Sequence, residues 1–96
     1  MAEYVLSFRT NPGRQLSVSE QEAWPQWFQQ IGDRLADFGH RVVRSQGLGT
    51  AEDVGDTLGG YVIVRADDFA ASMTIARGCP ALTQGGGVEV GELEAS

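Results

Sequence analysis

The hydrophobic residues of this 96-residue chain change their spacing from a period of 2 to a period of 3.6 and back, and this change constrains the fold more than any other feature. Residues 3–9 (EYVLSFR) are rich in β-branched and aromatic side chains and are followed by the turn-forming cluster Asn11-Pro12-Gly13. We therefore expect a first strand there. After Ser19, apolar residues recur mostly in steps of three and four along one helical face: Trp24, Trp27, Phe28, Ile31, Leu35 and Phe38.

The ends of this predicted helix carry recognisable signals. Ser19 and Glu22 have the spacing of a capping box, and Gly39 is a suitable residue for the helix to end at. Pro25 lies inside the pattern, where a proline removes one backbone hydrogen bond and clashes with the preceding turn at a cost of about 3 kcal/mol. We expect either a kink or a short separate turn before a main helix that begins near Trp24.

Three more strands are predicted further along the chain. Residues 41–47 (RVVRSQG) form a plausible second strand, and a polar loop with several glycines follows it. Residues 61–65 (YVIVR) are the strongest strand in the chain, and residues 88–93 alternate as the last strand.

A second helix is predicted between the last two strands. Asp67 or Asp68 caps its start, and Phe69, Met73 and Ala76 are expected to face inward, with Ser72 and Ile75 flanking them. Its end is indicated by a basic residue, a glycine and a proline in succession: Arg77, Gly78 and Pro80.

The resulting order βαββαβ predicts an α+β, ferredoxin-like fold. We expect a four-stranded antiparallel sheet with both helices on one face, built by a single domain that spans residues 1–96, since a chain of this length supports one core. The other face of the sheet would then be uncovered. A second copy packing there, sheet to sheet, would form a homodimer.

Composition excludes several classes of partner. Seven arginines, no lysines and thirteen acidic residues give a formal net charge of −6, which repels phosphate backbones and anionic lipid headgroups. We expect no nucleic-acid and no membrane partner. The single cysteine cannot form an intrachain disulfide, and the N-terminus lacks the basic start and apolar run of a signal peptide, so we expect a cytoplasmic protein.

The stretch GCPALTQGGGVEV (residues 78–90) holds the single cysteine and three consecutive glycines. Activated thiols usually lie at helix N-termini or beside cations, whereas Cys79 follows the end of a predicted helix, so we interpret it as a small buried residue. Arg77 is close in sequence and keeps an activated thiol open as the alternative. Gly85-Gly86-Gly87 leads from a helix into a strand, the reverse of a phosphate-binding loop, and we interpret it as a turn.

His40 is the only imidazole, and it stands beside Gly39 where the first helix is predicted to end. A cationic side chain there favours the helix dipole, so a capping role is preferred to general acid–base catalysis. One histidine, one distant cysteine and scattered carboxylates lack the spacing of metal ligands, and we predict no metal and no cofactor. His40 and Tyr61 are left as weak catalytic candidates.

One set of polar residues is predicted to share the uncovered face of the sheet. Strand alternation places Ser7 with Arg9, and Tyr61 with Arg65, and Glu89 has the same relation to the last strand. Because the third, first and fourth strands are neighbours in this fold, Arg9, Arg65 and Glu89 are candidates for a pocket that holds a small organic anion. The alternative is a paired ionic network at a dimer interface.

Three segments resemble the YCII-related family, in the group that includes DGPF-domain sequences. They are WFQQIGDRLADFG (residues 27–39), GGYVIVRADDFAASMTIARGCP (59–80) and GGGVEV (85–90), and the resemblance spans about the whole chain. It implies a ferredoxin-like fold assembled as a dimeric α/β barrel, with a small pocket between sheet and helices or inside the barrel.

The resemblance gives weak grounds for assigning the family's catalytic activity to this chain. In YCII-related proteins suspected of catalysis, a histidine of the first helix is thought to act with an aspartate just before a proline. Here residues 19–38 contain no histidine, and Cys79 stands before Pro80 in place of the aspartate. Some relatives resemble a dehydrochlorinase, but that chemistry needs a base which this chain does not supply at the matching position.

Two hypotheses about function follow. The first is a non-catalytic dimeric module that binds a small molecule or a partner, and the missing acid–base pair favours it. The second is a small lyase or isomerase that uses His40, Tyr61 or Glu89 as acid or base, with Arg9 or Arg65 holding an anionic substrate.

Overall fold

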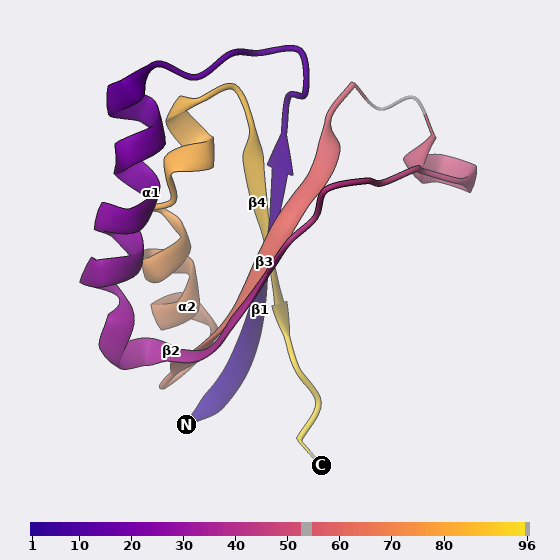
Figure 1. Cartoon of the computed structure of the whole chain (residues 1–96). Helices are drawn as coiled ribbons and strands as arrows, with labels where there is room; N and C mark the ends of the chain where they lie inside the picture. Colours follow the sequence, from indigo (N-terminus) through magenta and orange to yellow (C-terminus); the bar gives the residue numbers. More distant parts are fainter. Residues whose placement is uncertain (53–54, 96) are drawn as a thin grey trace.

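A computed structural model describes residues 1–52 and 55–95 of the chain. Its main elements are β1 (Ala2–Thr10), α1 (Val18–Gln30), β2 (Leu35–Arg41), β3 (Thr57–Ala66), α2 (Phe69–Ala76) and β4 (Gly87–Glu92) (Figure 1). Short 3₁₀ turns lie at Gly32–Arg34, Gly49–Ala51 and Pro80–Thr83. The four strands form an antiparallel sheet in the order β2-β3-β1-β4. The predicted ferredoxin-like βαββαβ fold is confirmed, including the neighbouring third, first and fourth strands.

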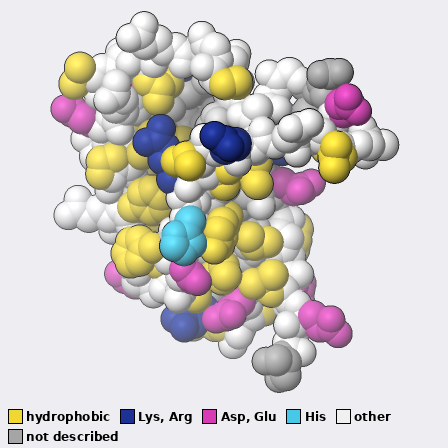
Figure 2. Space-filling model, turned by 45° about the vertical axis from the view of Figure 1, so that its right-hand side comes forward, with side chains coloured by type: hydrophobic (Ala, Val, Ile, Leu, Met, Phe, Trp, Pro, Cys, Tyr) yellow, Lys and Arg dark blue, Asp and Glu magenta, His cyan; other side chains and the backbone are white. Residues whose placement is uncertain are grey.

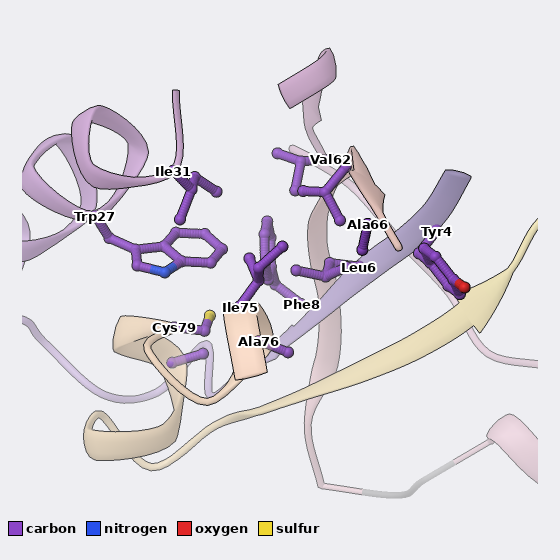
Figure 3. Packing of buried hydrophobic residues seen from close by; sticks show 12 residues of the cluster. Tyr4, Leu6, Phe8, Trp27, Ile31, Val62, Ala66, Ile75, Ala76 and Cys79 are labelled. Carbon is purple, nitrogen blue, oxygen red and sulfur yellow. The ribbon is translucent and has the colours of Figure 1, made fainter. Parts of the chain in front are cut away.

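Both helices lie against one side of the sheet, and neither covers the other side (Figure 1). Alternate residues of β1 and β3 are buried beneath the helices, as the period of 2 requires. Figure 3 shows how they pack with residues of α1 and α2; the core comprises Tyr4, Leu6, Phe8, Trp27, Ile31, Val62, Val64, Ala66, Ile75, Ala76, Cys79 and Ala81. The core therefore lies on the helical side of the sheet.

Helix α1 begins and ends earlier than its sequence pattern predicts. The capping box is formed by Ser17 and Glu20: the Ser17 hydroxyl accepts from the Glu20 N–H, and the Glu20 carboxylate accepts from the Ser17 N–H. The predicted Ser19–Glu22 box is wrong, because both serines precede a glutamate by three residues and spacing alone does not separate them. The helix is continuous across Pro25, so no separate turn precedes it.

The predicted extension of this helix to Phe38 is also wrong. The helix ends at Gln30, a 3₁₀ turn follows, and Leu35 and Phe38 belong to β2. The second strand is therefore Leu35–Arg41, where residues 41–47 were expected. Gly39 does not end a helix: its φ of 64° lies within the strand, and a Cβ there would collide with the carbonyl oxygen of Tyr61.

His40 accordingly has a different setting from the one expected. It lies on β2 directly opposite Tyr61 of β3, so the helix-capping interpretation is wrong. The two rings are 6.1 Å apart between centroids and inclined by 52°. His40 therefore belongs to the surface of the sheet.

Helix α2 begins as predicted but turns a different face inward. The Asp68 carboxylate caps it by accepting the Ala71 N–H at 2.8 Å. Phe69 was expected to face inward, but it lies at the first turn of the helix and is 46% exposed. Its ring packs edge to face with Tyr4. The buried residues of the helix are Ser72, Ile75 and Ala76. Ser72 tolerates burial because its hydroxyl donates to the Phe69 carbonyl at 2.6 Å.

Candidate ligand-binding cleft

An open cleft of about 1150 Å³ lies between α1 and the end of the sheet where β1 finishes and β3 begins. Its apolar wall is aromatic. Trp24 and Phe28 of α1 contribute to it together with Phe8 of β1, and Phe8 and Trp24 pack edge to face with centroids 5.2 Å apart. Phe38 of β2, 71% exposed, lies at the same cleft. Such a surface suits the carbon skeleton of a small organic molecule.

The charged residues that line the cleft are basic. Four of the seven arginines line it, namely Arg9, Arg14, Arg41 and Arg44, and no aspartate or glutamate of residues 1–52 or 55–95 is among its lining residues. Figure 2 shows arginine side chains close to a band of hydrophobic ones on the face turned forward. In a chain with a formal net charge of −6, the cleft concentrates positive charge against the overall balance.

The four arginines differ in what they bind. Arg9 donates to the Asp56 carboxylate at 2.8 and 3.0 Å and so is partly neutralised. Arg14 pairs with Glu20 at 2.7 Å. Arg41 and Arg44 are exposed, and neither forms an ion pair with a carboxylate of the described residues. Those two arginines are the cations best placed to accept a ligand anion.

Gln84 is the buried polar residue that holds the cleft wall together. Its side-chain carbonyl accepts the Trp24 indole N–H at 3.0 Å, and its amide nitrogen donates to the backbone carbonyl of Glu20 at 2.8 Å. Its own backbone carbonyl accepts from Arg14 at 3.1 Å. The turn after α2 thereby fixes both an aromatic ring and a guanidinium on the side of α1, so that part of the cleft is preformed.

Glu20 is part of the same network. The Ser17 N–H and then the Arg14 guanidinium hold the pKa of its carboxyl below the usual value, outweighing the effect of burial. The carboxylate stays ionised at neutral pH and keeps Arg14 in place. This arrangement connects the capping of α1 to the orientation of a cation at the cleft.

The predicted set of Arg9, Arg65 and Glu89 does share the face away from the helices, but its members are spread along it. Arg9 lies near one end of β1 and is bound to Asp56. Arg65 lies beside Glu3 at the other end, with 3.7 Å between the Arg65 Nε and a Glu3 oxygen. Glu3 and Arg9 are six residues apart on β1, a distance of roughly 20 Å at the rise of a strand. The three side chains do not form one pocket within a single chain.

His40 and Tyr61 both line the cleft and lie opposite each other on β2 and β3. Cys79 does not line it. Its side chain is buried in the core, and burial raises the pKa of the thiol to about 11. The interpretation of Cys79 as a structural residue fits this setting, because a thiol with that pKa is protonated at neutral pH.

Sequence reasoning missed most of the cleft. Arg14 lies after a turn, Gln84 lies in the turn after α2, and Arg41 and Arg44 were assigned to a strand that ends earlier. The one available signal was the placement of two arginines in a stretch, residues 40–51, that has no acidic residue.

In the described ranges 1–52 and 55–95, no group of three or more His, Cys, Asp or Glu residues is arranged to hold a metal ion. No helix in those ranges has the length and apolar character to span a membrane.

These features define a ferredoxin-like α+β domain with an arginine-lined cleft beside its sheet. No family model matches the chain, and no curated protein matches its sequence. Among solved structures, the chain is similar to 5-chloro-2-hydroxyhydroquinone dehydrochlorinase (TftG) from Burkholderia phenoliruptrix AC1100, in complex with 2,5-dihydroxybenzoquinone. The identity is 16% and the TM-score 0.66, over 98% of this chain and 95% of that one. At this identity the likeness shows a common fold.

Proposed function

We propose that this protein binds a small organic anion with an apolar, planar body in the cleft beside α1. The observation that carries the proposal is that four arginines, and no carboxylate of the described residues, line the cleft of a strongly acidic protein. Arg41 and Arg44 offer the exposed guanidinium groups, which suit carboxylate, phenolate or phosphate oxygens. Trp24 and Phe28 offer aromatic surface to the rest of the ligand.

Within this proposal, the protein is a binding module of the YCII-related type, without the acid–base pair that catalytic relatives are thought to use. Helix α1 contains no histidine, and the residue before Pro80 is a buried, protonated cysteine. The similarity in fold to the dehydrochlorinase supports the relationship to the family. Neither the histidine of the first helix nor the aspartate before the proline, the two groups with which that family's chemistry is thought to proceed, is present here.

The proposal is tested by comparing benzoate with benzyl alcohol, which keeps the ring but has no charge. We expect benzoate to bind more tightly, and Arg41→Gln with Arg44→Gln to weaken benzoate about tenfold while leaving benzyl alcohol unchanged. The matched control is Arg77→Gln, an exposed arginine that does not line the cleft. Equal binding of the two probes, or an equal loss in the control, would show that the cleft does not select anions.

A second candidate is a lyase or isomerase that acts on such an anion. His40 and Tyr61 favour it, because both line the same cleft and their rings lie 6.1 Å apart. One of them would remove or supply a proton while the arginines hold the substrate. Turnover of an anionic substrate that is lost in His40→Gln or Tyr61→Phe, with anion binding retained, would support this candidate. Unchanged turnover in both variants would exclude it.

A further inference from the structure

Phe38 of β2 differs from the other phenylalanines of the chain in its surroundings. It is 71% exposed, whereas Phe8 is buried and Phe28 is half-buried. The other three phenylalanines each pack against an aromatic ring, and no ring of the described residues packs against Phe38. Single exposed apolar residues are common on protein surfaces. Phe38 is set apart from them by its place in the strand and beside the cleft.

A β-bulge fixes the backbone at Phe38. Between Asp37 and His40, β2 has two residues where β3 has one. The extra residue makes the strand bulge at Phe38 and Gly39, and such bulges re-aim a side chain. Gly39 takes a left-handed φ of 64°, and its N–H donates to the Asp37 carboxylate at 2.7 Å. A glycine and a carboxylate thus hold the conformation that presents Phe38.

The side chain of Phe38 lies on the helical side of the sheet. Asp37 pairs with Ile63, which belongs to the face away from the helices, and successive side chains of a strand alternate between faces. Phe38 is therefore on the side of α1, and it lines the same cleft as Trp24 and Phe28 of that helix. The cleft has aromatic rings on α1 and a further ring on β2.

The middle strand carries no side chain between these two walls. Phe8 of β1, Gly60 of β3 and Arg41 of β2 form one row across the sheet, and all three line the cleft. Neighbouring strands are about 4.8 Å apart, so the backbones of Phe8 and Arg41 are separated by roughly 10 Å. A flat ring needs about 7 Å between the surfaces that enclose it, two van der Waals contacts of about 3.5 Å each. The row therefore leaves the width of one flat ring above Gly60.

We infer that Phe38 forms the second wall of the binding site and makes the cleft selective for anions with a flat aromatic body. The inference rests on the proposed binding of an organic anion and adds the shape of the ligand to it. The ligand ring lies between Phe38 and the aromatic residues of α1, so that both of its π faces meet an aromatic side chain. A saturated ring of the same size is thicker and has no π face.

Arg41 supplies the matching charge from the same strand. It pairs with Gly60, which belongs to the buried side of β3, so Arg41 shares the helical side of β2 with Phe38. Arg41 is exposed and forms no ion pair with a carboxylate of the described residues. One strand therefore presents a ring to the body of the ligand and a guanidinium to its anionic group.

The first experiment compares benzoate with cyclohexanecarboxylate, which carries the same charge on a saturated ring. Isothermal titration calorimetry at about pH 7.5 is expected to show benzoate binding about threefold more tightly to the wild type. Phe38→Leu should lose this preference, and Phe38→Tyr, which restores a ring, should keep it. Phe69→Leu is the matched control, because Phe69 is also exposed and does not line the cleft. Equal affinity for the two probes in the wild type, or an unchanged preference in Phe38→Leu, would overturn the inference.

Benzyl alcohol separates this inference from the proposed function. If the wild type binds benzoate more tightly than benzyl alcohol, and Phe38→Leu still prefers benzoate to cyclohexanecarboxylate, the anion site stands and the role of Phe38 is wrong. If the wild type does not distinguish benzoate from benzyl alcohol, the proposed function fails and this inference fails with it. Light scattering tests a second copy of the chain as the occupant. A lower mass of Phe38→Leu with an unchanged preference for benzoate would assign the ring to a contact between chains and overturn the inference.

A second experiment locates the ligand ring directly. In protein with isotope-labelled phenylalanine and tryptophan, the ring protons of benzoate are expected to give intermolecular NOEs to Phe38 and also to Trp24 or Phe28. These side chains line opposite walls of the cleft, so both sets of NOEs are needed for a ring held between them. NOEs to the residues of α1 without any to Phe38 would place the ligand on one wall only and overturn the inference.

Discussion

The Trp24 indole N–H donates to the side-chain carbonyl of Gln84 across 60 residues of sequence, at 3.0 Å. The Gln84 amide also satisfies the backbone carbonyl of Glu20, so one buried side chain holds the turn after α2 against α1. This contact sets the position of the aromatic wall of the cleft.

Gln84→Leu is expected to destabilise the protein by about 1–3 kcal/mol, because it leaves the indole N–H without its partner and removes the hydrogen bond to the Glu20 carbonyl. Urea denaturation followed by circular dichroism measures the change. Gln26→Leu is the control, since Gln26 is exposed on the same helix and makes no side-chain hydrogen bond with the described residues. An equally small loss of unfolding free energy in both variants would show that the buried amide does not stabilise the protein.

Gly39→Ala is expected to cost at least about 2 kcal/mol and to weaken the pairing of β2 with β3. The φ of 64° disfavours any side chain, and the added Cβ would meet the carbonyl oxygen of Tyr61. Gly32→Ala is the control, because nothing among the described residues lies within 4 Å of a Cβ at that position. Hydrogen exchange at the Tyr61 and His40 amides reports the local loss. Unchanged protection in Gly39→Ala would contradict the tight approach of the strands.

The lowered pKa of the Glu20 carboxyl predicts a specific loss of stability in acid. The folded-state pKa of its carboxyl is lowered, so its contribution is fully present above the unfolded-state pKa and is lost as the pH falls through the folded-state value. Glu20→Gln should therefore flatten the dependence of unfolding free energy on pH below about pH 4.5. Glu22→Gln, at an exposed position of the same helix, should leave this acid dependence unchanged. Identical acid dependence in wild type and Glu20→Gln would exclude this role.

Cys79 is expected to be unreactive in the folded protein. With a thiol pKa of about 11, only about one molecule in a thousand carries the thiolate at pH 8, and the side chain is buried. A disulfide reagent such as DTNB should react with it at the rate of unfolding in buffer and at once in denaturant. Rapid reaction of the native protein at pH 8 would instead indicate an exposed, activated thiol.

Particular residues show why the sequence predicts some of this structure and not the rest. The alternation of residues 61–65 and the carboxylate before α2 are local signals, and both elements form where they are expected. The helical spacing continues by coincidence through Ile31, Leu35 and Phe38. Ile31 directly follows the helix, whereas Leu35 and Phe38 lie on a strand. The turn at Gly32–Arg34 separates them, and its preference over one more helical turn arises from pairing β2 with β3.

The set of residues that lines the cleft could not be predicted from the sequence, for a related reason. Trp24, Arg14, Gln84 and Arg41 come from four separate segments, and each has an ordinary surface or core interpretation when taken alone. Gln84 acquires its role only because the turn after α2 folds back onto α1. The predicted Arg9, Arg65 and Glu89 were correctly assigned to one face, since strand alternation is local, but their separation along that face depends on the register of the pairing.

The proposed binding of an organic anion in the cleft is tested most directly by the two tryptophan indole signals in a ¹H–¹⁵N NMR spectrum during titration with benzoate. Trp24 lines the cleft, whereas Trp27 is buried in the core and serves as an internal reference. We expect the Trp24 indole signal to shift with benzoate and to shift much less with benzyl alcohol, while the Trp27 indole signal stays in place. No shift of the Trp24 signal with benzoate, or equal shifts with the charged and the neutral probe, would contradict it.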